Sequence, residues 1–99
     1  MTLDIRYTDQ ARDWIDGLRD RVARRRVFSR LDLLADGHFG DWRPVGEGVG
    51  ELRIHAGPGY RLYFARRGDM IVVILLGGDK SSQDRDIAKA KRLARDLDL

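Results

Sequence analysis

The chain has 99 residues, 42% of them hydrophobic and 35% charged, which is the size and composition of one small domain with a modest core. It has no cysteine, so disulfides and thiolate metal sites are excluded. The net charge is +3, and Lys80, Lys89 and Lys91 are the only lysines. The first residues do not resemble a signal peptide, and the longest apolar run, residues 70–78, is too short to span a bilayer. We therefore expect one cytoplasmic domain over residues 1–99.

The first third of the chain predicts a strand followed by two helices. Residues 2–7 alternate between polar and apolar side chains, which indicates a short strand. Thr8 and Asp9 are good N-cap residues, and the apolar positions after them recur at helical spacing as far as Gly17. A second helix is expected over residues 20–36, with Gly37 in the position that often ends a helix. One side of this helix is apolar, and the other carries Arg19, Arg21, Arg24, Arg25, Arg26 and Arg30.

The remainder predicts three strands and a last helix. Residues 37–50 have many glycines and few periodic apolar positions, so we expect a loop there. Strands are expected over residues 49–55, 60–66 and 70–77. The last of these is apolar on both faces, which favours an interior position if the N-terminal strand docks beside it. Ser81 and Ser82 are expected to cap the final helix. The fold class is α+β, in the order β-α-α-β-β-β-α, with a mostly antiparallel four-stranded sheet.

Three segments carry a resemblance to a known family. They are GxxELR at residues 48–53, GPGYRxYF at residues 57–64, and GGDKSSQ at residues 77–83. In this order and spacing, across nearly the whole chain, they resemble the RelE/ParE superfamily of toxins from type II toxin–antitoxin modules. The likeness is greatest to the phage-derived branch called addiction-module killer proteins, which is related to the HigB toxins.

The resemblance implies a RelE-like fold and a cognate antitoxin that wraps and neutralises the toxin, with higher-order toxin–antitoxin oligomers as a further expectation. Many members of the superfamily are ribosome-dependent endonucleases that cut mRNA in the A site, so ribosome and mRNA are expected partners. The ParE branch instead poisons DNA gyrase. A shared fold therefore does not identify the target.

The segment ELRIHAGPGYRLYF gathers side chains that suit RNA cleavage. Attack by a 2′-hydroxyl on the neighbouring phosphorus needs a base, cations around the phosphate and an acid at the leaving oxygen. Arg53 and His55 are two apart on one strand and share a side, as do Arg61 and Tyr63 on the next, while Lys80 can reach the same surface. We expect Arg53, His55, Arg61 and Lys80 to be catalytic and Tyr63 to contact RNA. No metal or other cofactor is expected.

Each of these residues also has a purely structural interpretation. For Arg61 the alternative is a cross-strand ion pair with Glu51, and for Arg53 it is a solvated strand face. A polar turn residue, a packing contact and a loop-steadying charge are the alternatives for His55, Tyr63 and Lys80. The arginine side of helix 20–36 is either a solvated face or a surface for an acidic antitoxin or ribosomal RNA. Under the second interpretation Arg24 and Arg25 contact RNA.

The chain departs from the best-known ribosome-dependent members, which carry an arginine on the fourth strand and a tyrosine near the C-terminus. Here that strand is apolar and no tyrosine follows Tyr63, so a missing acid or base would come from His55 or Lys80. Three functions stay open: a ribosome-dependent mRNA endonuclease, a ParE-like gyrase inhibitor, and an antitoxin-bound scaffold that autoregulates its operon. The endonuclease is the prediction. Phe39 and Trp42, in the expected loop, are interpreted as core anchors.

Overall fold

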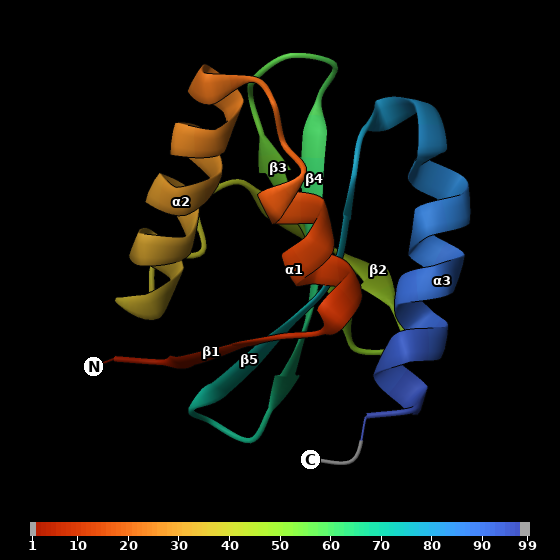
Figure 1. Ribbon diagram of the computed structural model, residues 1–99. Helices are drawn as coiled ribbons and strands as arrows, with labels where there is room; N and C mark the ends of the chain where they lie inside the picture. The colour runs from red at the N-terminus through yellow and green to blue at the C-terminus, as the bar shows by residue number, and fades with distance from the viewer. Residues whose placement is uncertain (1, 98–99) are drawn as a thin grey trace.

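One mixed sheet, with its strands in the order β1-β5-β4-β3-β2, organises the fold. The computed structural model describes residues 2–97 and places helices on both faces of this sheet (Figure 1). The elements are β1 (Asp4–Tyr7), α1 (Asp9–Asp16), α2 (Arg21–Ala35), β2 (Trp42–Gly46), β3 (Val49–Ile54), β4 (Tyr60–Arg67), β5 (Ile71–Gly78), a 3₁₀ turn η1 (Lys80–Ser82) and α3 (Gln83–Arg95).

The sheet has five strands, which corrects the expected four. The additional strand, β2, lies within the segment that was expected to be a loop, and it pairs antiparallel with β3. Glu47 and Gly48 join the two strands with φ of 54° and 77°. Two consecutive residues at positive φ form the tight turn that matches the twist of a hairpin. Because β2 is an exposed edge strand, its sequence lacks the apolar alternation by which strands are recognised.

The interior position expected for β5 is confirmed. β1 pairs with it in parallel, with Asp4 opposite Ile71, and β4 pairs with its other side. The Thr8 hydroxyl donates a hydrogen bond to the Leu75 carbonyl at 2.6 Å and accepts one from the Ala11 N–H. Thr8 therefore caps α1, as predicted, and also fixes that helix on β5.

The two faces of the sheet carry separate cores. Alternate residues of β3, β4 and β5 pack under α1 and α2, and their neighbours pack under α3. The first core includes Ile15, Val27, Leu31, Leu34, Leu52, Leu62, Phe64 and Ile74. The second is thinner and includes Val49, Tyr63, Ala65, Val73, Leu75, Ala90 and Ala94. The two alanines of α3 let this helix approach the sheet closely, so polar groups of β3 and β4 become buried beneath it.

The start of α3 differs from the expected serine cap. Asp79 accepts a hydrogen bond from the Ser81 N–H at 2.8 Å, and the short turn η1 precedes the helix. The Ser82 hydroxyl instead donates to Asp86 at 2.5 Å. The Asp79 carboxylate therefore caps η1, whereas α3 begins after Ser82 without a hydrogen bond from a capping side chain. None of the helices within residues 2–97 is long and apolar enough to cross a membrane.

Candidate functional site

The polar face of the β3–β4 hairpin is built around a buried carboxylate. The strand register places Glu51 opposite Tyr63 and Arg53 opposite Arg61. Glu51 is fully buried, and it lies 3.0 Å from Arg43 Nε, 3.3 Å from Arg53 Nε and 3.7 Å from Arg61 Nε. One acidic side chain therefore joins arginines from β2, β3 and β4.

α3 completes this cluster. Gln83 Nε2, in the first turn of α3, donates to Glu51 Oε2 at 2.9 Å. Burial opposes ionisation of Glu51, but hydrogen bonds from Arg43, Gln83 and Arg53 outweigh it and hold the pKa of this carboxyl below its ordinary value. Glu51 therefore stays charged at neutral pH and orients the arginines around it. The Glu51–Arg61 contact is the cross-strand ion pair that the sequence offered as the structural alternative for Arg61, whereas the contacts of Glu51 with Arg43 and Gln83 were not predicted.

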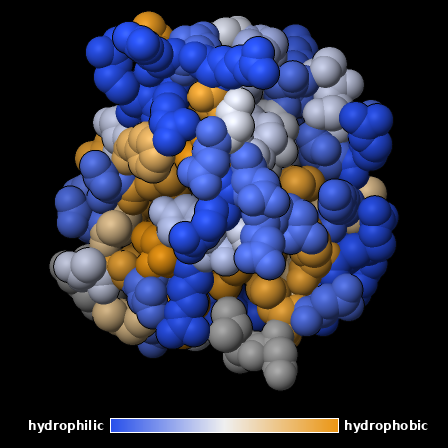
Figure 2. All heavy atoms as spheres, viewed as in Figure 1, coloured by the Kyte–Doolittle hydropathy of each residue, from blue (hydrophilic) through white to orange (hydrophobic). Residues whose placement is uncertain are grey.

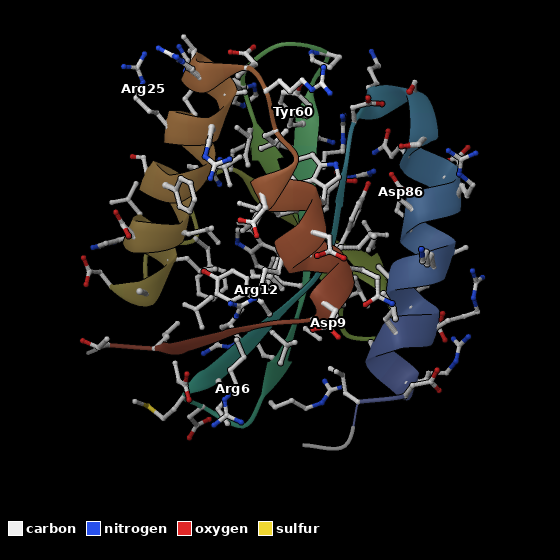
Figure 3. All side chains as sticks on the ribbon, in the orientation of Figure 1. Arg6, Asp9, Arg12, Arg25, Tyr60 and Asp86 are labelled. Atoms are coloured by element: carbon white, nitrogen blue, oxygen red, sulfur yellow. The ribbon has the colours of Figure 1, made fainter. Side chains whose placement is uncertain are left out.

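Arg53 and Arg61 line an open pocket beside the Gly-Pro-Gly turn. Arg61 is almost fully buried, and its Nη1 donates to the Gly59 carbonyl at 2.6 Å, so the guanidinium is held by the turn as well as by Glu51. The pocket has a volume of about 420 Å³. Its lining consists of Arg53, Ile54, His55, Ala56, Gly57, Gly59, Tyr60 and Arg61. Tyr60 belongs to the end of the molecule where α2 begins (Figure 3).

His55 follows the last residue of β3 and stands at the rim of the pocket. Its side chain is 75% exposed, and its Nε2 lies 2.6 Å from Asp41 Oδ2. A carboxylate that accepts the Nε2 proton fixes the imidazole and leaves Nδ1 free to take a proton. Asp41 precedes β2, and its role was missed because the segment containing it gave no pattern that would place it against His55.

Lys80 lies next to the same turn. Its backbone N–H contacts the Pro58 carbonyl at 3.4 Å. Lys80 Cβ and Arg61 Nη1 both lie close to Gly59, because a Cβ placed on this glycine would be 3.6 Å from the first and 3.2 Å from the second. Only the turn therefore lies between the lysine and the arginine. The four residues expected to be catalytic, Arg53, His55, Arg61 and Lys80, thus gather around one turn.

Tyr63 lies outside the pocket and has no exposed surface with which to make the RNA contact expected of it. The side chain is fully buried under α3, and its hydroxyl makes no hydrogen bond of good geometry within residues 2–97, although the Glu51 carboxylate lies near it. Burial and the nearby Glu51 and Asp86 carboxylates raise the pKa of Tyr63 above its usual range. The phenol is therefore a neutral packing group, which was the structural alternative considered for it.

Arg24 and Arg25 lie on α2, across the sheet from Glu51. The Arg24 guanidinium covers the Phe28 ring at 5.5 Å and donates to the Asp16 carbonyl at 3.2 Å, so it serves the helix surface. Arg25 is exposed and projects from the end of α2 at which the hairpin turn also lies (Figure 3). Hydrophilic residues cover this end of the molecule (Figure 2). The two arginines are thus not in the pocket but flank its end of the domain.

Phe39 and Trp42 belong to one aromatic cluster on the α2 face. Their ring centroids are 5.8 Å apart, and each lies within 5.6 Å of Phe64. Trp42 remains 44% exposed because no helix covers β2. The interpretation of these residues as core anchors is therefore right only for the side of each ring that packs in the cluster.

The pocket has the chemistry of an anion site. Two guanidiniums and an imidazole line one open space, Lys80 lies on the other side of the turn, and the nearest buried carboxylate already holds both guanidiniums. Planar guanidiniums bind phosphate oxygens in pairs. Within residues 2–97 no three acidic or histidine side chains form a group that could hold a metal ion.

Comparisons with known proteins agree with this architecture. The family model of phage derived protein Gp49-like matches residues 13–97. An uncharacterized protein of Haemophilus influenzae is 41% identical over 99 residues, which cover the whole of both chains.

Solved toxin structures share the fold at much lower identity. A mutant of the E. coli toxin RelE in the free state has a TM-score of 0.72 at 13% identity, covering 98% of this chain and all of that one. YafQ in the E. coli DinJ–YafQ toxin–antitoxin complex gives 0.65 at 14% identity, over 83% of this chain and 97% of that one. RelE in the RelE–RelB complex of Pyrococcus horikoshii gives 0.60 at 17%, over 81% and 97%. The chain therefore belongs to the phage-derived Gp49-like family, and its fold is that of the RelE superfamily of toxins.

Proposed function

We propose that this protein is the toxin of a type II toxin–antitoxin module and cuts mRNA on the ribosome. The observation that carries the proposal is the gathering of Arg53, His55, Arg61 and Lys80 around one turn, with Arg53 and Arg61 held in place by Glu51. These groups supply what cleavage through a 2′-hydroxyl requires, and none of them needs a cofactor.

The proposed step is a transesterification within the RNA. His55 Nδ1 takes the proton of the 2′-hydroxyl, and the 2′-oxygen forms a bond to the adjacent phosphorus. The bond from phosphorus to the 5′-oxygen of the next nucleotide breaks, and Lys80 gives that oxygen a proton. Arg53 and Arg61 bind the phosphate oxygens while their negative charge increases. The products are a 2′,3′-cyclic phosphate and a 5′-hydroxyl.

The proposed protein partner is a cognate antitoxin. The RelE-like folds of YafQ and of the archaeal RelE occur in complexes with DinJ and RelB, respectively. A free nuclease of this kind would stop growth, so neutralisation by a co-expressed partner belongs to the proposal. Cytoplasmic location and assembly into larger toxin–antitoxin complexes are part of it too, because the ribosome is the place of action.

Primer extension tests the proposal directly. A defined mRNA is incubated with purified protein, with and without translating ribosomes. New 5′ ends, mapped as shortened cDNAs, that appear only with ribosomes and disappear with Arg61→Ala of unchanged fold are the expected result. Intact message beside arrested growth contradicts the endonuclease.

Inhibition of DNA gyrase is the second candidate, and one observation favours it. No tyrosine follows Tyr63, and β5 is apolar on both faces, so the proposed proton transfers rest on His55 and Lys80. A protein that only binds its target needs neither group. Supercoiling assays with purified gyrase separate the candidates: inhibition there, together with uncut mRNA, would make gyrase the target.

A further inference from the structure

A second, smaller basic depression adjoins the Arg53–Arg61 pocket. It has a volume of about 210 Å³ and is lined by Arg26, Ser29, Arg30, Ile54 and His55. Ile54 and His55 also line the first pocket, so the two depressions meet at the end of β3. His55 therefore stands between two basic surfaces, one formed by the β3–β4 hairpin and the other by α2.

Arg26 supplies an available positive charge to this depression. Its Nη1 donates to the His55 backbone carbonyl, which fixes the guanidinium at the end of β3. Considering residues 2–97 only, neither Arg26 nor its exposed neighbour Arg25 has a carboxylate within ion-pair distance. Charges without an internal partner are free to bind an external anion.

Arg30 and Ser29 complete the depression in different ways. Arg30 is directed at backbone carbonyls: Nη1 donates to Arg53, and Nη2 donates to Phe39 at 2.9 Å and to Asp41 at 3.1 Å. It therefore contributes charge to the floor but has few donors left for a ligand. Ser29 is exposed one helical turn from Arg26 and presents a hydroxyl that can donate to an anionic oxygen.

The neighbouring acid does not neutralise the depression. The Asp41 carboxylate contacts His55 Nε2 on the β2 side, and it also interacts electrostatically with Arg30. Arg26 and Arg30, which line the depression, outweigh the single charge of Asp41 and leave a net charge of +1, from two positive charges and one negative. A small, anionic, oxygen-rich group is the ligand that this arrangement favours.

We propose that this depression is a second phosphate-binding subsite, which takes the phosphodiester on the 5′ side of the nucleotide whose 3′-phosphate lies between Arg53 and Arg61. The proposal rests on the proposed function, because the first pocket must hold the scissile phosphate. A 2′-hydroxyl lies on the sugar between these two phosphates. Two subsites that share His55 therefore bring this hydroxyl to the imidazole, and they fix the direction in which the strand runs across the protein.

Binding of a short, uncleavable nucleic acid tests the subsite. The probe is a 2′-deoxy dinucleotide, used with and without a 5′-phosphate, and titrated into ¹⁵N/¹³C-labelled protein by NMR. The chain has two histidines, so the ring signals of His55 report on the site, while those of His38, in the loop after α2, serve as an internal control.

The wild-type protein is expected to bind the 5′-phosphorylated probe about tenfold more tightly, as one additional charge-assisted contact gives. The slope of log Kd against log salt concentration should steepen by about 0.7 for this phosphate. Ser29→Glu places a carboxylate at the depression and should abolish the difference, whereas Ser29→Gln, equal in size and neutral, should keep it. Thermal unfolding of both variants checks the helix.

The outcomes separate this inference from the proposed function. If wild-type protein binds both probes equally at the first pocket, or if Ser29→Glu leaves the tenfold difference intact, the subsite is overturned and the endonuclease proposal stands. If neither probe shifts the His55 signals, the subsite is overturned, and primer extension with ribosomes decides separately on the endonuclease.

Discussion

Arg53 lies directly opposite Arg61 in the antiparallel register of β3 and β4. Like charges in this position ordinarily repel and destabilise a hairpin. Here the carboxylate of Glu51 contacts both guanidiniums from beneath α3, so the two cations are held together despite their repulsion. The stability of the hairpin should thus depend on the charge of Glu51, and this dependence can be measured.

Replacing Glu51 should damage the site and the fold together. Glu51→Ala leaves three arginines without their common partner and should lower the free energy of unfolding by about 3–5 kcal/mol. Glu51→Gln keeps the size and should cost less, but it should still reduce the rate of RNA cleavage because Arg53 and Arg61 lose their orientation. Urea unfolding followed by circular dichroism, with cleavage kinetics, measures the two effects.

Glu47→Gln is the matched control for this prediction. Glu47 is an exposed acid that pairs with Arg95 at 2.9 Å and Lys91 at 3.8 Å. Its loss should change stability by less than about 1 kcal/mol, as exposed ion pairs do. Equal effects of the Glu47 and Glu51 substitutions would contradict the central role of Glu51.

Stability should fall at acid pH through the same carboxylate. The pKa of Glu51 is lower in the folded protein than in the unfolded chain, so the folded state gains stability above the unfolded value, near 4.3, and loses it as pH falls through the folded value. Asp79, whose pKa is lowered chiefly by its hydrogen bond to the Ser81 side chain, acts in the same direction. Unfolding measured between about pH 7 and pH 2 should therefore show a decline that is flatter in Glu51→Gln.

Tyr63→Phe should leave cleavage unchanged and preserve or raise stability. The Tyr63 hydroxyl is buried without a hydrogen-bond partner in residues 2–97, so its removal relieves a desolvation cost of about 1 kcal/mol. In a domain of this size that corresponds to a rise of about 4–8 °C in Tm. Differential scanning calorimetry measures the shift. Loss of activity at unchanged stability would restore Tyr63 as a contact for RNA.

Asp41→Asn should slow cleavage by releasing the imidazole of His55. His55→Ala removes the proposed base and should cost about 10²–10⁴-fold in rate, while Asp41→Asn should cost less. The double variant should be no slower than His55→Ala, since both changes act through one group. Single-turnover rates across pH measure this. Additive losses would mean that Asp41 acts independently; Asp13→Asn, exposed on α1, is the control.

The fold could be predicted from the sequence wherever burial produces a periodic pattern of apolar residues. The two apolar faces of β5 required cover on both sides, and helices occupy both. Arg53 and Arg61 could be placed together because residues of equal parity share a face of a hairpin. β2 escaped prediction because an exposed edge strand closed by Glu47 and Gly48 has no apolar periodicity to detect.

The partners of the candidate site were harder to predict, since they depend on contacts between distant segments. Glu51 is fully buried on the face of the sheet that α3 covers, which no local pattern could reveal. Gln83, 32 positions away, then reaches its carboxylate. Asp41 meets His55 through the unrecognised β2. Local pattern assigns a side chain to a face, but it does not reveal what will cover that face.

The parallel pairing of β1 with β5 has a consequence for biosynthesis. Asp4 and its neighbours are made well before their partners, which begin at Ile71. The β1–β5 pair therefore closes only after the intervening residues have left the ribosome, since contacts so distant in sequence must wait for them. Lys80 follows β5 directly, so it reaches the turn beside the pocket at the same stage. A nascent chain would carry no finished site until β5 and Lys80 have been translated.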